Sequence, residues 1–458
     1  MTFAGGRARA AAAVLGLCSL VPPALVVADI ARHGQNVPYM DEWRNVVPLA
    51  VKTAAGTAAV SDLFRQQNAH FMVFHNLTSV VLTRLTRWNL KVGMYWTVVL
   101  ALGLFALAVS AFGWERYWLW LPFSAIVFSL RQREVWLWAH LDFYPFVAAL
   151  FVAALLVLRR RPGSRAALAA AAGMSAVATV SVASGMVFWP VLFFALPALG
   201  YRARALRLLW IAAAFVTLAV YFAQYRWIRS GVVQDPGFLL RFLFAYLGSP
   251  LVRQDPASVR QAQVIAAAGL VVAAGSALYL WKQGRAEHRT ALLPGLALIG
   301  MAIACGLFTG AGRGNFGVPQ ALESRYATHA SLFWLGALAL ALFSLADARF
   351  AGFTGTARRV LAAAGAGTLV FVLGRVAWVS YGALRSRPLV TPAHVECFLA
   401  FPRTRDTACL QGLHPRPETL GGLIDDLAVH RLALFGATPP PGPAAASPPA
   451  APAAGRAP

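Results

Sequence analysis

Long apolar runs separated by short polar connections dominate this sequence, and most of them have the length of a membrane-spanning helix. A helix needs about 20 apolar residues to cross the hydrocarbon core of a bilayer, and it satisfies its own backbone hydrogen bonds there. The first run extends from Ala10 to about Ala31, after Arg7 and Arg9. Further spans are predicted at residues 92–112, 117–130, 135–158, 166–182, 186–200, 208–227, 262–281, 290–309, 330–346 and 359–380. The pattern predicts an all-α polytopic membrane protein with about 11 transmembrane helices.

The stretch after the first run mixes polar and apolar positions. Within residues 32–91, the segments 43–51 and 70–88 each fit an amphipathic helix that lies on the membrane surface. In the second segment, Arg84 and Arg87 stand among aliphatic residues, which suits an interfacial helix better than a span. Residues 32–91 are therefore predicted as a first extracytoplasmic loop with outward-facing interfacial helices.

The basic residues of the short loops test this topology, because such loops carry excess Lys and Arg on the cytoplasmic side. If residues 70–88 lie flat, all the basic clusters fall on that side; if they cross, the first cluster is forced outside. The clusters are Arg159–Arg161, Arg202/Arg204/Arg207, Lys282/Arg285/Arg289 and Arg349/Arg358/Arg359. The flat arrangement predicts a multi-pass protein of the cytoplasmic (inner) membrane, with a cytoplasmic N-terminus and an extracytoplasmic C-terminus.

Composition supports the membrane assignment. Of the 458 residues 59% are hydrophobic and 12% are charged, and the mean hydropathy is +0.62, whereas soluble domains carry about 25% charged residues. The formal net charge of +23 would also fit a nucleic-acid partner. Basic residues that flank helices and contact lipid headgroups explain it better, so membrane lipids are expected as partners and nucleic acid is not.

Three parts follow along the chain: a transmembrane domain (1–382), a short extracytoplasmic tail (383–436) and a Pro/Ala-rich end (437–458) that is predicted to be disordered. An odd number of spans places Cys397 and Cys409 of the tail in an oxidising compartment. A disulfide between them is therefore predicted, worth about 3 kcal/mol in the loop-entropy model.

The first candidate for chemistry is the acidic pair Asp41-Glu42, directly after the first span and beside Trp43. A carboxylate at this interface can act as a general base on an acceptor hydroxyl, and Asp41 can also bind a divalent metal. The alternative is that the pair begins an interfacial helix, whose positive N-terminal dipole favours carboxylates. In the same loop, His70 either orients an acceptor or has a structural role.

Two later stretches carry charged groups at a predicted outer face. Residues 131–142 combine Arg, Glu134, His140 and Asp142 with two tryptophans. Charged groups at such a depth usually point into a cavity, although an ordinary loop role is equally open for Glu134 and His140. The stretch 310–326 combines glycines, which allow close backbone approach, with arginines that can grip a phosphate bidentately. Its donor and phosphate candidates are Arg313, Arg325 and Tyr326, together with His140; snorkelling arginines in a flexible loop are the alternative.

Several short motifs resemble a known family. They are Tyr39-Met40-Asp41-Glu42-Trp43, Asn68-Ala69-His70, Ser184-Gly185 with Trp189-Pro190, Glu323-Ser324-Arg325-Tyr326, and in the tail Cys397, Cys409-Leu410 and Leu432–Phe435. With the order of span, outward acidic pair, interfacial helices and many further spans, the chain is similar to the GT-C superfamily of membrane glycosyltransferases. That superfamily includes the protein O-mannosyltransferases and the lipid A aminoarabinose transferases, and uncharacterised bacterial relatives resemble the chain more closely.

The resemblance implies a sugar transferase that uses a polyprenyl-phosphate sugar donor on the outer face. Asp41 matches the catalytic acid, Glu134 or Asp142 the second acidic position of some members, and Arg325 a ligand of the donor phosphate. Ala69 departs from the pattern, where a Glu is expected, so a carboxylate role beside His70 is in doubt. No large soluble domain follows the last span, so the acceptor stays open among envelope glycans, lipids and proteins.

Two other classes of function remain as alternatives. A polysaccharide polymerase or ligase also uses polyprenyl-linked glycans, but it relies on late-loop arginines and histidines rather than on an early acidic pair. A membrane transporter or lipid flippase predicts charged residues inside spans, of which Arg375 is the clearest. No cofactor is required by any motif, and a divalent cation, Mg²⁺ or Mn²⁺, is compatible with Asp41.

Overall fold

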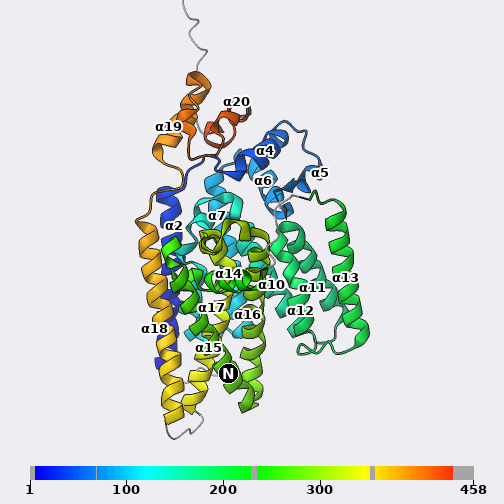
Figure 1. Ribbon diagram of the computed structural model, residues 1–458, viewed down its shortest axis with the longest axis vertical. Coiled ribbons are helices and arrows are strands. Elements are labelled where there is room, and N and C mark those ends of the chain that lie inside the picture. The colour runs from blue at the N-terminus through cyan, green and yellow to red at the C-terminus, as the bar shows by residue number, and fades with distance from the viewer. Residues whose placement is uncertain (1–5, 69, 228–234, 351–355, 437–458) are drawn as a thin grey trace, which may run out of the picture.

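A computed structural model describes the chain except residues 1–5, 69, 228–234, 351–355 and 437–458. The Pro/Ala-rich end and Ala69 therefore lie outside the described residues. Long helices run side by side along the longest dimension of the molecule, and small helices gather at one end (Figure 1). We call this the tail end of the bundle, because the C-terminal tail lies there.

Eight helical segments in the described part of the chain are long and apolar enough to cross a membrane, so the fold is that of an all-α multi-pass membrane protein. They are α1 (Gly6–Ser19) with α2 (Val21–His33), α7 (Leu90–Phe112), α10 (Phe143–Arg160), α13 (Arg204–Ala223), α15 (Val259–Gln283), α16 (Ala286–Arg313), α17 (Ala327–Phe350) and α18 (Thr356–Leu384).

The remaining predicted spans form shorter helices, so the count of about 11 is not confirmed. Segment 166–182 corresponds to α11 (Arg165–Ser181), and segment 186–200 to η4 (Ala183–Val187) with α12 (Phe188–Ala195). Segment 117–130 holds η1 (Tyr117–Leu119) and α8 (Trp120–Val127), which has 8 residues. An apolar run sets the preference for a lipid-like environment but does not by itself fix how long its helix is.

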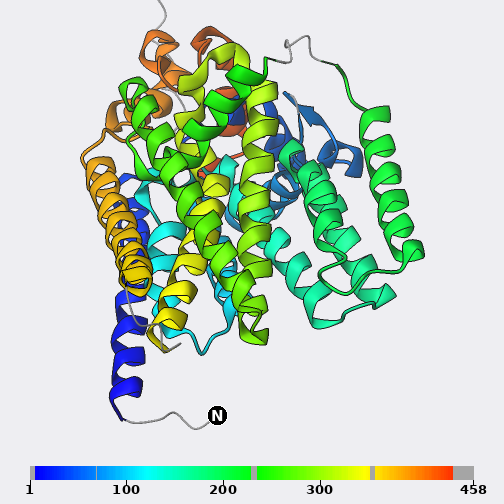
Figure 2. The same ribbon diagram turned by 60° about the horizontal axis from the view of Figure 1, so that its bottom comes forward.

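The first predicted span is broken once. α1 ends at Ser19 and α2 starts at Val21, with Pro22 and Pro23 in its first turn. Proline suits the first turn of a helix, where its missing N–H is not needed, but interrupts the backbone ladder of a helix that runs through it. The two halves still lie end to end along the bundle (Figure 2).

The predicted interfacial segments lie at the tail end (Figure 1). Segment 70–88 begins as strand β2 and continues as α6, which has 14 residues and is not among the candidate spans. The strand β2 pairs antiparallel with β1, with Gln67 opposite His70. The short elements at this end are α3 (Asp41–Asn45), α4 (Val47–Ala54), α5 (Val60–Leu63), β1 (Gln66–Gln67), β2 (His70–Phe71), α6 (Val73–Thr86), α9 (Arg133–Leu137), α19 (Pro392–Thr404) and α20 (Gly421–Val429).

One further helix, α14 (Pro236–Gly248), packs between the long helices with Phe242–Gly248 largely buried. Single turns of 3₁₀-helix fill the connections. They are η2 (Leu130–Gln132), η3 (Ala139–Leu141), η5 (Ser249–Leu251), η6 (Pro256–Ser258), η7 (Gly314–Phe316), η8 (Val318–Leu322), η9 (Ser324–Tyr326), η10 (Ala408–Leu410), η11 (Pro417–Thr419) and η12 (Ala433–Gly436).

Contacts between loops agree with the predicted alternation of sides. Arg159 donates to the carbonyls of Ala111 and Thr290, and a cleft of about 290 Å³ is lined by Arg159, Gly200 and Thr290. These positions come from connections that were all predicted to face one side. On the other side, the backbone of Met40 bonds Leu413, and the side chain of Gln66 bonds the backbone of Arg226.

Small residues set how closely the helices approach, as is usual where lipid surrounds a bundle. A Cβ on Gly336 of α17 would lie 2.5 Å from the Gly295 carbonyl oxygen of α16. A Cβ on Gly185 would lie 2.2 Å from the Ala178 carbonyl of α11. Larger residues at these positions would push the backbones apart, so the glycines fix how closely these helices pack.

Candidate functional site

The acidic pair Asp41-Glu42 is divided between solvent and interior. Both residues lie in the first turn of α3, and successive helical residues point about 100° apart. Asp41 is exposed, and its Oδ2 accepts a bond of 3.3 Å from the Asn68 side chain. Glu42 is 2% exposed. Of the two predicted carboxylates, Asp41 is therefore the one that is open to solvent.

The backbone in front of Asp41 has an unusual conformation that the tail holds. Met40 has φ 47° and ψ −117°, a combination that costs a residue with a side chain about 1–3 kcal/mol. Its N–H donates to the Leu413 carbonyl at 2.7 Å, and the ring of Trp43 lies 5.9 Å from that of Phe398 in α19. The direction in which Asp41 points is thus set by contacts with the C-terminal tail.

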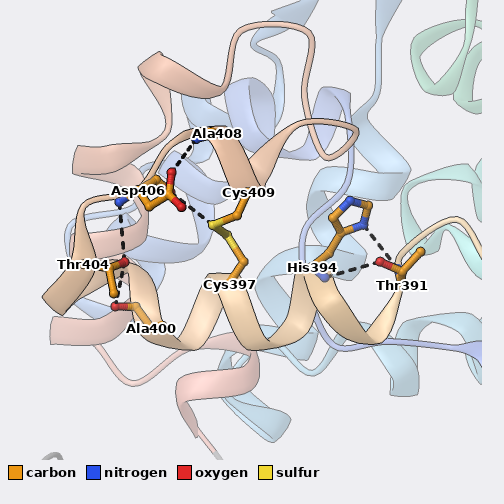
Figure 3. Close-up of a disulfide and its surroundings, with 8 residues drawn as sticks. All are labelled: Thr391, His394, Cys397, Ala400, Thr404, Asp406, Ala408 and Cys409. Atoms are coloured by element: carbon orange, nitrogen blue, oxygen red, sulfur yellow. Dashed lines mark hydrogen bonds between the residues drawn. A yellow bond between two sulfur atoms is a disulfide. The ribbon is translucent and has the colours of Figure 1, made fainter.

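A disulfide fixes the part of the tail that makes these contacts (Figure 3). Thr391 caps α19 by accepting from the His394 backbone N–H, and Cys397, one turn further, is bonded to Cys409 with a Cα–Cα distance of 5.8 Å. The bridge holds η10, and with it the turn that leads to Leu413, against α19. The predicted pairing of the two cysteines is present in the structure.

We expect Cys397→Ser to loosen the Asp41 loop without unfolding the bundle. The bridge closes a loop with a sequence separation of 12, and removing it should destabilise the tail by about 3 kcal/mol in the loop-entropy model. Hydrogen exchange at the Met40 amide should accelerate in this variant but not in Cys18→Ser, which changes a free cysteine. Unchanged exchange at Met40 would mean that the tail does not hold the loop.

Glu42 is a buried carboxyl that keeps its proton at neutral pH. Burial raises its pKa from the ordinary 4.5 to about 8, the backbone N–H groups of Tyr39 and His140 oppose this rise, and the charges of Asp142 and Asp41 add to it. The Tyr39 N–H donates to Glu42 Oε2 at 2.8 Å. The buried Glu42 carboxyl therefore stabilises the turn before α3 by accepting the Tyr39 N–H.

We expect Glu42→Gln to change how stability depends on pH. Between about pH 4.5 and 8 the folded protein binds more protons at Glu42 than the unfolded chain does, so rising pH destabilises the wild type by up to about 1.4 kcal/mol per unit. Glutamine does not titrate. The melting temperature of the variant, relative to that of the wild type, should rise as the pH increases to about 8. Above that pH the difference between the two melting temperatures should stay constant. An equal gain in Glu115→Gln, an exposed carboxyl, would contradict this origin.

A buried polar cluster lies beneath the loop. His75 of α6 bonds Asp142 Oδ1 through Nδ1 at 2.8 Å, and its Nε2 lies 3.2 Å from Ser79 Oγ. The His140 ring packs edge-on against His75, at 4.6 Å between centroids, and stacks on Trp138. Because His75, Asp142 and His140 are all at most 4% exposed, this cluster joins α6 to the start of α10 rather than facing solvent.

Two arginines of the second stretch join distant elements. Arg131 donates through Nε to the carbonyls of Ser249 and Val252 and through Nη2 to that of Leu322. Arg133 forms a buried pair with Asp29 of α2, at 3.0 Å, and also bonds the carbonyls of Ser386 and Arg387. A buried arginine needs this degree of pairing, so both arginines have a structural role in joining these elements.

Glu134, the next residue, faces the third stretch. Arg325 Nη1 lies 3.6 Å from Glu134 Oε2, and its Nη2 lies 3.9 Å from Glu323 Oε2. Glu323 also accepts from the Gln254 side chain at 3.0 Å. The Arg325 side chain is 29% exposed, so its guanidinium is paired but still open to solvent. Such an arginine can exchange a loose carboxylate contact for a bidentate bond to phosphate.

Tyr39 connects this ion cluster with the acidic loop. Its ring packs edge-on against Trp138 at 5.3 Å. Burial raises the pKa of its hydroxyl, the Glu134 charge raises it further, the Arg325 charge lowers it, and the Glu323 charge raises it. The Tyr39–Trp138 contact joins the first predicted stretch to the second, and the Glu134–Arg325 pair joins the second to the third.

The other predicted residues lie around this centre. Arg313 is the last residue of α16, and it has no hydrogen-bond or ion-pair partner among the residues that the structure describes. Tyr326 is 7% exposed, with its ring 5.5 Å from the Arg325 guanidinium. His70 lies in β2 and is partly exposed.

A metal site of protein ligands alone is not formed in the described ranges, since nowhere in them do three His, Cys, Asp or Glu side chains gather to hold an ion. Mg²⁺ often uses one or two carboxylates with water and substrate phosphate, and Asp41 fits that minimal role.

The sequence pattern gave no role to Tyr39, His75 or Gln254. Tyr39 stands inside the acidic motif, so its closeness to Asp41 was a usable signal. No local signal pairs His75 with Asp142, since 67 residues separate them, and Gln254 stands in a loop without a motif.

Comparison of the chain with protein-family models, with curated proteins and with solved structures finds no match in any of the three. The fold class, a multi-pass helical membrane protein, therefore rests on the helices themselves, and the assignment of function rests on the site.

Proposed function

We propose that this chain is a membrane glycosyltransferase of the GT-C type, which moves a sugar from a polyprenyl-phosphate donor to an envelope glycan, lipid or protein. One observation carries the proposal. An exposed carboxylate, Asp41, and a partly exposed arginine, Arg325, belong to stretches that are joined through Tyr39, whose ring packs on Trp138, and through Glu134, which pairs with Arg325. A base and a phosphate ligand are the two groups that such a transfer needs.

In the proposed reaction, Asp41 accepts the proton of the acceptor hydroxyl while the oxygen of that hydroxyl attacks the anomeric carbon of the sugar. The bond between that carbon and the phosphate oxygen breaks, and polyprenyl phosphate leaves with the electron pair. Arg325 stabilises the charge that develops on the leaving phosphate, assisted by Arg313. Glu134 and Glu323 hold the guanidinium in place before the donor arrives.

The proposal includes the finer topology. Eleven crossings are counted when α8, α11 and α12 cross as short helices, which puts the N-terminus and the tail end on opposite sides. The basic residues of the short loops then make the N-terminus cytoplasmic and the tail end extracytoplasmic. The reaction on the outer face then uses the lipid-linked donor without any nucleotide sugar. The disulfide Cys397–Cys409 stands in an oxidising compartment.

The test is mass analysis of envelope glycans and polyprenyl-phosphate lipids from cells that lack the protein, complemented with the wild type or with Asp41→Asn. Loss of one glycan decoration with accumulation of a lipid-linked monosaccharide, rescued by the wild type alone, is the expected result. Accumulation of a lipid-linked oligosaccharide would instead indicate a polymerase or ligase. No change in any glycan, or full rescue by the variant, would favour a transporter or flippase.

A further inference from the structure

Arg375, the charged residue inside the last span, belongs to a second cluster that the proposed reaction does not use. Its guanidinium lies 4.3 Å from the centroid of the Trp378 ring, and the guanidinium of Arg253, from the loop after η5, lies 4.2 Å from the same centroid. Beyond them on α18, Arg385 lies 4.4 Å from the ring of Tyr381. Cation–π contacts thus collect arginines on one exposed face of α18.

The positive charge of this cluster has no carboxylate to balance it. Arg375 donates through Nε to the Leu251 carbonyl at 2.9 Å and through Nη2 to the Gln261 side chain at 3.3 Å, and both acceptors are neutral. Within the described ranges, neither Arg253 nor Arg375 lies in an ion pair with Asp or Glu. Two guanidiniums on one indole repel each other, and a bound anion would remove that repulsion.

The cluster lies near one end of a candidate membrane span. Trp378 is six residues before the end of α18, which is about 9 Å along a helix, and Trp and Tyr concentrate at the membrane interface, where lipid phosphates lie. Only 22% of the apolar window of α18 is buried inside the protein, so most of this helix is open to lipid. Trp378 and Tyr381 are 39% and 53% exposed.

We propose that Arg253, Arg375 and Trp378 bind the phosphate of an anionic membrane lipid in the leaflet at the tail end. Two guanidiniums offer bidentate donors to the phosphate, and basic sites between membrane helices take anionic headgroups in this way. The cluster uses none of the residues assigned to the proposed transfer, because Arg325 pairs with Glu134 and Glu323 whereas Arg253 and Arg375 lie on Trp378. This inference does not rest on the proposed transferase activity.

The experiment measures melting temperature of the purified full chain in nanodiscs of phosphatidylcholine with increasing phosphatidylglycerol. The wild type is expected to gain stability as the anionic lipid is added. Arg253→Gln should need about fivefold more phosphatidylglycerol for the same gain, the effect of one basic residue near an anionic surface. Arg260→Gln, an equal charge change at an exposed position on the same side, should behave as the wild type.

Three results would overturn the inference. The first is an equal response of the wild type and Arg253→Gln. The second is an Arg253-dependent gain from inorganic phosphate alone, which would make this a site for free phosphate. The third is an Arg253-dependent gain from polyprenyl phosphate but not from phosphatidylglycerol, which would assign the cluster to the donor. If Arg253→Gln does not fold in phosphatidylcholine, Trp378→Leu replaces it, since it removes the ring and keeps both charges.

Discussion

Asp41→Asn is expected to lower the rate of sugar transfer about a thousandfold, within the 10² to 10⁴ that a general base contributes. The amide is nearly isosteric with the carboxylate, and its oxygen can still accept the bond from Asn68. It cannot accept a proton from the acceptor hydroxyl. The fold should therefore persist while the chemical step is lost, and the acceptor should bind with little change.

The measurement is transfer of labelled sugar in membranes from a strain that lacks the protein, with melting temperature as the check on folding. Asp62→Asn serves as the matched control, because Asp62 lies in the same loop and pairs with Lys52 at 2.7 Å instead of facing the acceptor. Glu42→Gln should cause a far smaller loss at neutral pH, since the wild-type carboxyl already carries its proton there. Full activity of Asp41→Asn would show that Asp41 is not the general base of the transfer.

Arg325→Gln is expected to have the second largest effect, a loss of about 10² to 10³ in rate, as when a donor to a developing negative charge is removed. Glutamine keeps much of the length of the side chain but has no charge. Arg325→Lys should restore part of the rate, because it returns the charge without the planar fork that meets phosphate bidentately.

The assay is the same, with the donor concentration varied so that effects on binding and on turnover are separated. Arg403→Gln, an exposed arginine of the tail, is the charge-matched control. Without Arg325, the carboxylates of Glu134 and Glu323 lose their shared partner, so the melting temperature must be followed as well. Equal rates for Arg325→Gln and Arg403→Gln would show that Arg325 does not contact the leaving phosphate.

The helical class of the protein followed from the sequence because it depends on local properties. Apolar runs of about 20 residues and the need for each segment to satisfy its own backbone in lipid leave few other structures. The count of spans was less secure. Segment 117–130 is as apolar as the others, yet it holds an 8-residue helix beside a 3₁₀ turn, since helix length depends on what the segment packs against.

The candidate stretches were also visible in the sequence. Which of their residues are buried in structural contacts and which stay exposed was not. Arg131, Arg133 and Arg325 are the same residue type, and no local sequence signal separates them. Arg131 and Arg133 are buried against backbone carbonyls and Asp29, whereas the Arg325 side chain stays partly exposed. The same holds for the acids. Asp142 is bonded to His75 in the interior, while Glu134 faces Arg325.

The sequence by itself thus determined the all-α membrane class, the extent of most long helices and the stretches that hold the charged candidates, because hydrophobicity and charge are properties of single segments. The tertiary structure decided that Asp41 is exposed and Glu42 buried, that the tail holds Met40 through Leu413, and that Tyr39 stands beside the Arg325 cluster. Burial and pairing arise from contacts between residues far apart in the chain, and no pattern within one segment records them.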